Sequence, residues 1–221
     1  MRYVAIVGAS ALAVVLAALL VGAAAPSAAP SCFGKPATIV GTPGRDHLGG
    51  TDNDDVIYLG GGDDVADAHE GNDRLCGGDG DDELHGGDGS DHTDGGEGDD
   101  FVDGRRGLAD KTVGGPGADD IIGGSVIKGG SGDDVLDSYS YLREVGVDKV
   151  SGGPGDDSIS GDSKSHEGEQ LSGGSGDDTI SGEGNDDRLD GGGGNDDLNG
   201  GSGRDRCAQG PGSGTVRNCE H

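Results

Sequence analysis

The sequence is poor in aromatic residues: it has no tryptophan, two phenylalanines and four tyrosines among 221 residues. Aromatic side chains supply much of the area that an ordinary globular core buries, so their scarcity argues against such a core. Glycine is abundant instead, at 51 residues, and it recurs at a fixed interval. That strict recurrence also argues against simple disorder.

Positively charged residues are also scarce. The chain has 15 Lys and Arg residues against 43 Asp and Glu residues, and its net charge is −28. A field of this sign excludes nucleic acid and anionic membrane surfaces as expected partners, and it calls for cations. Without cations, the acidic chain is expected to repel itself and to remain extended.

Motifs for catalysis are missing as well. The six histidines form no H-E-x-x-H pair, and no serine lies in a G-x-S-x-G turn. The glycine-rich runs lack the lysine of a phosphate-binding loop, and the aspartates around them would repel phosphate. We therefore expect that the protein is not an enzyme.

What the chain does contain is a nine-residue repeat. Residues 77–103 read GGDGDDELH, GGDGSDHTD and GGEGDDFVD, which are three gapless copies of G-G-x-G-x-D-x-U-x. Glycine at the first, second and fourth places permits positive φ and close approach of neighbouring strands. The eighth residue (Leu84, Thr93 or Val102) forms a short strand with one inward side chain. One unit cannot bury a core alone, so the copies must stack as a solenoid.

This pattern resembles the RTX, or haemolysin-type calcium-binding, repeat. The resemblance implies an all-β fold: a right-handed parallel β-roll, or β-solenoid, in which two nonapeptides make one turn. It also implies that multiple Ca²⁺ ions are held in the glycine-rich turns by the sixth-place Asp and by backbone carbonyls of successive turns. The chemistry of the residues agrees, because carboxylates and carbonyls form an all-oxygen set that suits a large, hard cation.

The candidate metal ligands are the sixth-place aspartates. The alternative interpretation is that these residues only form turns, since Asp and Gly favour turns anyway; turn chemistry does not require Asp at one fixed place in so many units. The candidates are Asp46, Asp55, Asp64, Asp73, Asp82, Asp91, Asp100, Asp110, Asp119, Asp134, Asp148, Asp157, Asp178, Asp187, Asp196 and Asp205.

The roll is expected over residues 41–208, with an irregular segment at 104–172. Within it, residues 123–128 form a short copy without an Asp, and SYSYL is inserted at 138–142. A twelve-residue departure at 161–172 places Gln170 near the ligand place. We expect residues 123–172 to open first when calcium is lowered, and we regard the irregular segment as the best candidate for a partner-binding patch.

The two ends of the chain differ from the repeats. Residues 1–29 contain Arg2, an apolar run and then AAPSAAP, which indicates a cleaved secretory signal peptide. An uncleaved membrane anchor is the main alternative, because the run is about long enough to span a bilayer, and a lipid anchor at Cys32 is another. Residues 30–40 and 209–221 are expected to form N-terminal and C-terminal caps.

Four cysteines fit an oxidising compartment. Cys207 and Cys219 enclose a short loop and are the natural pair, which leaves Cys32 and Cys76 two turns apart on one face of the roll. We therefore predict the pairs Cys32–Cys76 and Cys207–Cys219; free buried thiols are the alternative.

We interpret the chain as a secreted, extracellular, monomeric calcium-binding protein whose roll folds on binding multiple Ca²⁺ ions. A calcium-dependent adhesion or structural protein of the cell surface, with an unknown surface or protein ligand, is the second hypothesis. A non-catalytic fragment of an RTX toxin or secreted enzyme is the third. The toxins and proteases of the family typically carry a C-terminal secretion signal and a catalytic or pore-forming module, whereas here we expect an N-terminal signal peptide and no such module.

Overall fold

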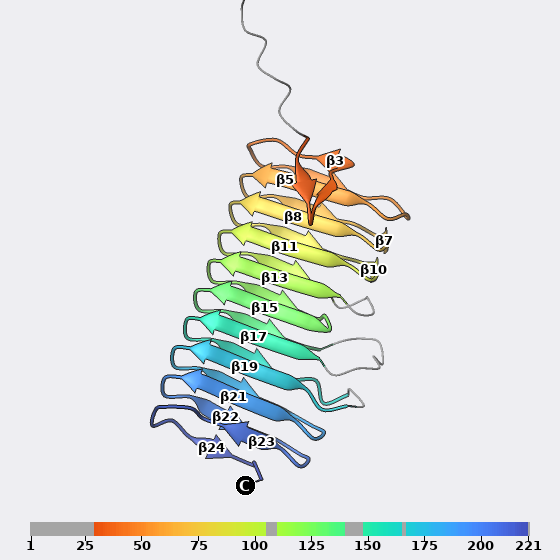
Figure 1. Cartoon of the computed structure of the whole chain (residues 1–221). Coiled ribbons are helices and arrows are strands. Elements are labelled where there is room, and N and C mark those ends of the chain that lie inside the picture. Colours follow the sequence, from red (N-terminus) through yellow and green to blue (C-terminus); the bar gives the residue numbers. More distant parts are fainter. Residues whose placement is uncertain (1–28, 105–109, 140–147, 165–166, 221) are drawn as a thin grey trace, which may run out of the picture.

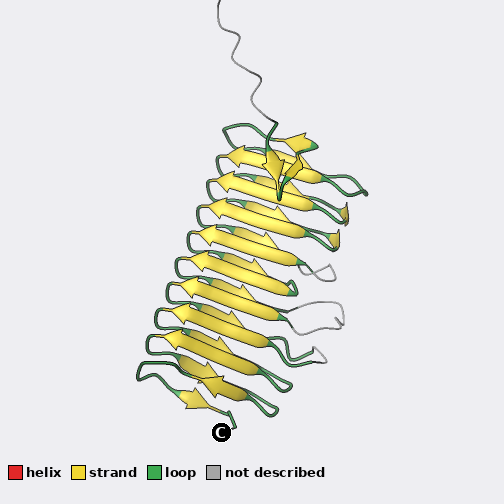
Figure 2. Cartoon of the chain, viewed as in Figure 1, coloured by secondary structure: helices red, strands yellow, loops and turns green. Residues whose placement is uncertain are grey.

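The computed structural model describes residues 29–104, 110–139, 148–164 and 167–220. Every regular element in these residues is a β-strand (Figure 2). Strands stack one above another from the N-terminal to the C-terminal end, and turns join them on both sides (Figure 1). The expected parallel β-solenoid is confirmed. The expected signal peptide lies outside the described residues, and within them no helix has the length and apolarity needed to cross a bilayer.

Sheet I is a ten-stranded parallel sheet made of every second strand of the roll. Its strands are mostly six residues long because the first three residues of the following repeat, two glycines and the next residue, continue the ladder. The strands are β3 (Ile39–Val40), β5 (Val56–Gly61), β8 (Arg74–Asp79), β11 (His92–Glu97), β13 (Lys111–Pro116), β15 (Val126–Ser131), β17 (Lys149–Pro154), β19 (Gln170–Ser175), β21 (Arg188–Gly193) and β23 (Arg206–Ala208).

Sheet II is the second ten-stranded parallel sheet, and it is made of the alternate strands. The strands are β4 (His47–Gly49), β6 (Val65–Asp67), β9 (Glu83–His85), β12 (Phe101–Asp103), β14 (Asp120–Ile122), β16 (Val135–Asp137), β18 (Ser158–Ser160), β20 (Thr179–Ser181), β22 (Asp197–Asn199) and β24 (Val216–Arg217).

Four short strands lie outside the two sheets. β7 (Glu70–Gly71) and β10 (Asp88–Gly89) pair in parallel within the turns of two neighbouring coils. β1 (Ser31–Cys32) and β2 (Lys35–Pro36) form an antiparallel hairpin that lies against β5 and β8 (Figure 1). The hairpin therefore covers the outer side of sheet I at the first coils.

The core is a double row of inward side chains between the sheets. Leu84 pairs in register with Ala66 on one side and Val102 on the other, so each coil repeats its inward position. Leu75, Leu84 and Leu198 are fully buried, as are most of the other inward residues. Two inward positions hold threonine, Thr93 and Thr112, and both are buried. One small or medium side chain per strand gives a thin core for a chain of this length.

Both predicted disulfides are confirmed. Cys32 and Cys76 are bonded, with a Cα–Cα distance of 5.7 Å, and this bond fixes the N-terminal hairpin to β8. Cys207 and Cys219 are bonded at 5.8 Å, and Cys207 packs against the core at the other end. The two bonds thus secure the open ends of the stack, where a solenoid has no further coil to pair with.

The irregularities of the sequence all fall on one side of the roll. They occupy the connections β12–β13, β14–β15, β16–β17 and β18–β19, each of which leads from sheet II to sheet I. The opposite turns, which lead from sheet I to sheet II, keep the G-G-x-G-x-D pattern throughout the same region. We name these two sides the interrupted edge and the regular edge. Parallel pairing continues through the irregular segment, for example from Ile121 to Leu136 to Ile159.

Candidate metal centres

The sixteen candidate aspartates form two rows, one at each edge of the roll. Each stands directly before a strand, so its backbone is fixed by the ladder that the strand begins. The regular edge carries nine of them: Asp46, Asp64, Asp82, Asp100, Asp119, Asp134, Asp157, Asp178 and Asp196. The interrupted edge carries the other seven: Asp55, Asp73, Asp91, Asp110, Asp148, Asp187 and Asp205.

These carboxylates are almost entirely removed from solvent. All but one are buried, most with 4% exposure or less; Asp46, in the first coil, is only partly buried. Carboxylates are rarely buried unless something pairs with them, because desolvation of a charge is costly. A continuous row of them therefore requires a partner.

Backbone N–H groups pair with one oxygen of most of these carboxylates. Along the regular edge, the N–H of each aspartate donates a hydrogen bond to Oδ1 of the aspartate in the next coil. The distance is 2.9 Å from Asp64 to Asp82 and 2.8 Å from Asp82 to Asp100. The chain of bonds continues through the irregular segment, at 2.9 Å from Asp119 to Asp134 and 3.0 Å from Asp134 to Asp157. The regular edge is thus one unbroken carboxylate ladder.

The ladder on the interrupted edge has a gap. It runs from Asp55 to Asp110 through the same N–H to Oδ1 bonds. Ser125 occupies the next ladder position, directly before β15, so this coil has no carboxylate there. Asp148 follows in the next coil, in register with Ser125.

Glu169 fills a ladder position that the repeat pattern did not predict. It is 1% exposed, and its N–H donates a 2.9 Å hydrogen bond to Oδ1 of Asp187. Gln170, which the sequence places near the ligand position, instead begins β19 and is exposed. Counting two residues back from the inward Leu171 would have identified Glu169, because the sixth and eighth places of a repeat are two residues apart.

In most ladder aspartates the second carboxylate oxygen has no hydrogen-bond donor; the first coils differ, since Oδ2 of Asp55 accepts hydrogen bonds from Thr51. In twelve of them, Oδ2 is inaccessible to solvent and makes no hydrogen bond in the described part of the chain. A buried anionic oxygen without a partner is strongly unfavourable. The twelve are Asp64, Asp73, Asp82, Asp91, Asp100, Asp119, Asp134, Asp157, Asp178, Asp187, Asp196 and Asp205.

Backbone carbonyls face the same oxygens. A Cβ added to Gly77 would overlap both Oδ2 of Asp82 and the carbonyl oxygen of Gly95 in the next coil. Gly173 stands in the same relation to Asp178 and Gly191. The first glycine of the repeat therefore leaves a cradle, lined by one carboxylate oxygen and one carbonyl oxygen, that any side chain would fill.

Burial and mutual repulsion disfavour the charged form of several ladder aspartates. Burial, with neighbouring aspartates as a further cause, raises the pKa of Asp82 to about 6 and that of Asp100 to about 7. The pKa of Asp134 is raised to about 7 for the same reasons. Backbone N–H donors act in the opposite direction but do not offset burial. At neutral pH a cation or a proton would therefore stabilise Asp82, Asp100 and Asp134 in the folded roll.

A hard cation fits this donor set. Among the described residues, no group of three His, Cys, Asp or Glu side chains converges on one point. An ion at an edge would therefore take carboxylate oxygens together with backbone carbonyls, the mixed all-oxygen shell that Ca²⁺ accepts and Mg²⁺ or Zn²⁺ does not favour. The orphan oxygen and the glycine cradle supply both kinds of donor.

The fifth-place acids form a separate, exposed row. The N–H of Asp99 donates a 3.0 Å hydrogen bond to Oδ1 of Asp81, and that of Asp156 donates a 2.8 Å bond to Oδ1 of Asp133. All four side chains are in solvent. They extend the turn-to-turn bonding outward, and water can solvate their remaining oxygens.

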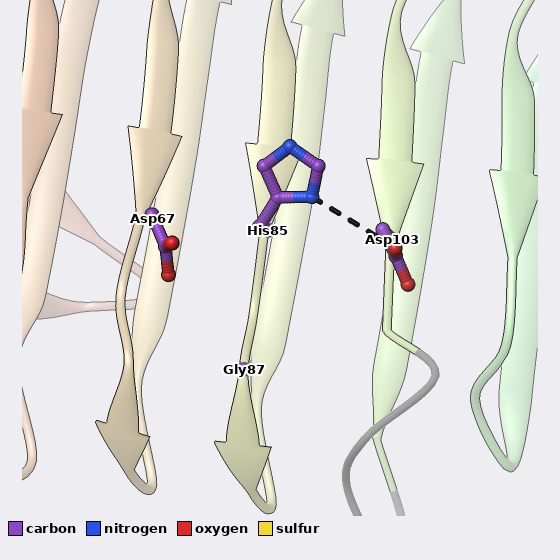
Figure 3. Close-up of a pocket in the computed structure, with 4 residues that line it drawn as sticks. All are labelled: Asp67, His85, Gly87 and Asp103. Carbon is purple, nitrogen blue, oxygen red and sulfur yellow. Dashed lines mark ion pairs between the residues drawn. The ribbon is translucent and has the colours of Figure 1, made fainter. Parts of the chain in front are cut away.

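A small hollow of about 270 Å³ lies on the outer side of sheet II, lined by Asp67, His85, Gly87 and Asp103. The three polar side chains stand on neighbouring strands β6, β9 and β12 (Figure 3). His85 Nδ1 lies 3.8 Å from Asp103 Oδ2, and its Nε2 lies 3.0 Å from Oε1 of Glu83. This hollow belongs to an acidic outer surface and is separate from both ladders.

The comparisons with known proteins agree with the geometry. A family model described as the RTX calcium-binding nonapeptide repeat matches the chain in four copies, at residues 40–75, 67–102, 145–163 and 172–207. The matched segments cover slightly more than half of the sequence and include coils on both sides of the irregular segment. No curated protein matches the chain.

Proposed function

The chain belongs to the RTX calcium-binding nonapeptide repeat family, and from this premise we propose a secreted protein whose roll folds as it takes up several Ca²⁺ ions. The ladder aspartates and the carbonyls of the glycine turns would hold the ions. The observation that carries the proposal is the orphan Oδ2 of twelve buried aspartates.

Electrostatics support the demand for divalent ions. Carboxylates on neighbouring coils are about 4.8 Å apart if they follow the strand spacing. At an effective dielectric constant of about 20, two such charges repel by roughly 3 kcal/mol. The regular edge repeats this arrangement from Asp46 to Asp196 without interruption. A Ca²⁺ ion between coils replaces that repulsion with attraction to both carboxylates.

The thin core supports coupling between calcium uptake and folding. Each strand buries one inward side chain, and several of these are small, such as Ala66 and Thr93. Ordering a glycine-rich backbone costs more conformational entropy than ordering other residues. Because the cradles require two stacked coils, they do not exist in the unfolded chain, and the binding free energy becomes folding free energy.

We propose a binding role without catalysis. The described residues that line three surface hollows are mostly acidic or basic groups, which suit the binding of ions and charged partners. Adhesion at a cell surface is the second candidate, and one observation favours it: the outer side of sheet I carries a column of exposed cations.

Export is part of the proposal. The apolar run after Arg2 has the composition of a signal peptide. Both disulfides suit an oxidising compartment, since cytosolic proteins seldom keep such bonds. Extracellular calcium is in the millimolar range in which modules of this kind bind.

Equilibrium dialysis of residues 30–221 against calcium tests the proposal. We expect several ions per chain, with half-saturation at about 10⁻⁴–10⁻³ M, and no displacement by equimolar Mg²⁺. Uptake of one ion or none by a chain with intact disulfides would contradict it. Displacement by Mg²⁺ would contradict the choice of metal.

A further inference from the structure

The outer sides of the two sheets carry opposite charge. On sheet I, six of the fifteen Lys and Arg residues point outward: Arg74, Lys111, Lys128, Lys149, Arg188 and Arg206. Outward positions of sheet II hold six acids, with Arg217, His47 and His85 as the basic exceptions: Asp67, Glu83, Asp103, Asp120, Asp137 and Asp197. We name the outer side of sheet I the basic face.

The strand register places five of these cations in a single column. His92 pairs with Arg74 on one side and with Lys111 on the other. Further along, Gln170 pairs with Lys149 and with Arg188. Arg188 then pairs with Arg206. The column thus follows the long axis of the roll, along the row of strands labelled β8 to β23 (Figure 1).

Spacing within the column is regular. Arg74, Lys111, Lys149 and Arg188 stand on every second strand of sheet I, which corresponds to about 10 Å between charges at about 4.8 Å per strand. Lys128, on the intervening strand β15, fills the next outward position. The result is a row of positive charges along the roll, with Lys128 beside it and Arg206 on the strand next to that of Arg188.

These cations are available to a ligand. Lys111, Lys128, Lys149, Arg188 and Arg206 are exposed, and Arg74 is half-buried beside the N-terminal hairpin. In the part of the chain that the structure describes, none of the six lies within ion-pair distance of a carboxylate. Acids are present on these strands as well: Asp94 and Asp190 face outward, and Asp79 and Glu97 are exposed at the ends of β8 and β11.

Compensation of the negative charge of the ladder aspartates does not explain why these cations form a column on sheet I. Each column residue directly follows an aspartate or Glu169 of the interrupted edge, so a compensating role could be suspected. The regular edge has the longer, unbroken ladder, yet none of its nine aspartates is followed by Lys or Arg. Compensation would place cations on that edge first.

The basic face also has a hollow in its C-terminal half, on β17, β19 and β21. This depression of about 250 Å³ is lined by Lys149, Gln170 and Arg188, together with Val150, Leu171, Ser172 and Asp190. Gln170 lies between the two cations, on the strand that separates them. A cationic group on each side and amide and hydroxyl groups between them match an acidic sugar, which presents one anionic group and several hydroxyls.

We propose that the basic face binds an extended anionic polysaccharide, carboxylated or sulfated, along the axis of the roll. The face is long and narrow, and most of its described outward positions are charged or polar rather than the apolar anchors that dominate protein interfaces. A linear polyelectrolyte needs no such anchor, because release of its counterions supplies the free energy. This proposal goes beyond calcium binding but requires the folded roll.

Duplex nucleic acid fits the face less well. DNA carries one charge per about 1.7 Å of its axis, which is far denser than one cation per about 10 Å. The exposed acids of the regular edge, such as Asp81 and Asp156, border sheet I and would repel a partner as wide as a duplex. A single sugar chain can remain within the column.

The test is binding of calcium-loaded residues 30–221 to hyaluronan, to chondroitin sulfate, to uncharged dextran and to duplex DNA. Hyaluronan carries carboxylates only, so a preference for chondroitin sulfate would identify sulfate as the recognised group. The double variant Lys149→Glu/Arg188→Glu should weaken binding about tenfold or more. Arg45→Glu/Arg217→Glu makes the same change in net charge away from the basic face and is the matched control.

The expected result is salt-dependent binding to one or both acidic polysaccharides, lost in the face variant and kept in the control. Circular dichroism in calcium must give the same spectrum for the parent chain and both variants, which shows that all of them are folded. If the folded parent chain then fails to bind either polysaccharide, this proposal is contradicted, while the proposed calcium function is unaffected. Equal losses in both double variants, or tighter binding of DNA than of either polysaccharide, would overturn it.

Discussion

The N–H of Asp82 donates a 2.8 Å hydrogen bond to Oδ1 of Asp100, one coil further along, while Oδ2 of Asp100 is buried without a hydrogen-bond partner. One carboxylate thus holds its neighbouring coil through one oxygen and offers the other to a cation. The same division of roles recurs along both edges. It explains why the repeat requires Asp rather than Asn or Ser at this place, since only a carboxylate has two accepting oxygens and a charge.

Substitutions of the adjacent residues Asp82 and Asp81 distinguish the effect of a buried ladder carboxylate from the effect of negative charge in general. Asp82→Asn keeps the shape but removes the charge at a ladder position, and we expect it to destabilise the calcium-loaded roll by about 1.5–3 kcal/mol. Asp81→Asn removes the same charge from an exposed turn position, so its effect should stay within about 0.5 kcal/mol. Urea unfolding in millimolar calcium measures both. Equal effects of the two substitutions would mean that total charge, not ladder position, matters.

The glycine cradle gives a second matched pair. Gly77→Ala would bring a Cβ against Oδ2 of Asp82 and the carbonyl of Gly95, and we expect a loss of about 2–3 kcal/mol with weaker calcium uptake. Gly193 lies in β21, where an added Cβ meets nothing within 4 Å. Gly193→Ala should therefore be neutral or slightly stabilising. If both variants bound calcium like the parent chain, the cradle would not be the site.

The raised pKa values predict how the metal-free chain responds to pH. Below the usual carboxyl pKa of about 4, Asp82 and Asp100 are protonated in both the folded and the unfolded state. Between about 4 and the folded pKa values of about 6 for Asp82 and about 7 for Asp100, the folded state holds more protons. Stability of the metal-free roll is therefore lost as the pH rises through that window.

In calcium-free buffer we accordingly expect more β structure at pH 5 than at pH 8. Protons and Ca²⁺ compete for the same oxygens, so the midpoint of a calcium titration should lie at a higher concentration at pH 5 than at pH 7.5. Circular dichroism at both pH values checks the two expectations. β content that rises with pH in the absence of calcium would contradict the direction of the pKa shifts.

The gap at Ser125 changes the expectation for the weakest region. The sequence predicts that residues 123–172 open first as a block, but the regular edge bonds straight through them from Asp119 to Asp134 to Asp157. We now expect the interrupted edge alone to open first. On lowering calcium, the amides of Ser125 and Val126, which donate to the carbonyl of Asp110, should lose protection before that of Asp134. Amide exchange followed by NMR would contradict this if all of them exchanged together.

Much of the fold follows from the nine-residue period. It predicts that Leu84 and Val102 point inward, that the aspartates before the strands line up, and that Cys32 lies near Cys76. These features depend only on the spacing along the chain, which a solenoid converts directly into position.

What the period could not show is the difference between odd and even units. Two units make one coil, so alternate units build different sheets. The residue that follows the sixth-place Asp is mostly basic in the units of sheet I and mostly acidic or neutral in the units of sheet II. Lys149 and Ser158 occupy the same place in the repeat, yet they lie on opposite outer sides of the roll. A period of eighteen residues carries this signal. The insertions follow the same rule, since all of them lie at the edge that leads from sheet II to sheet I.

The coupling between calcium and folding is tested most directly by far-ultraviolet circular dichroism of residues 30–221 with both disulfides intact. We predict a largely disordered spectrum in chelator at pH 7.5, cooperative gain of β structure with millimolar Ca²⁺, and no such gain with equimolar Mg²⁺. The same β spectrum in chelator and in calcium would show that the roll folds without metal and would contradict the account.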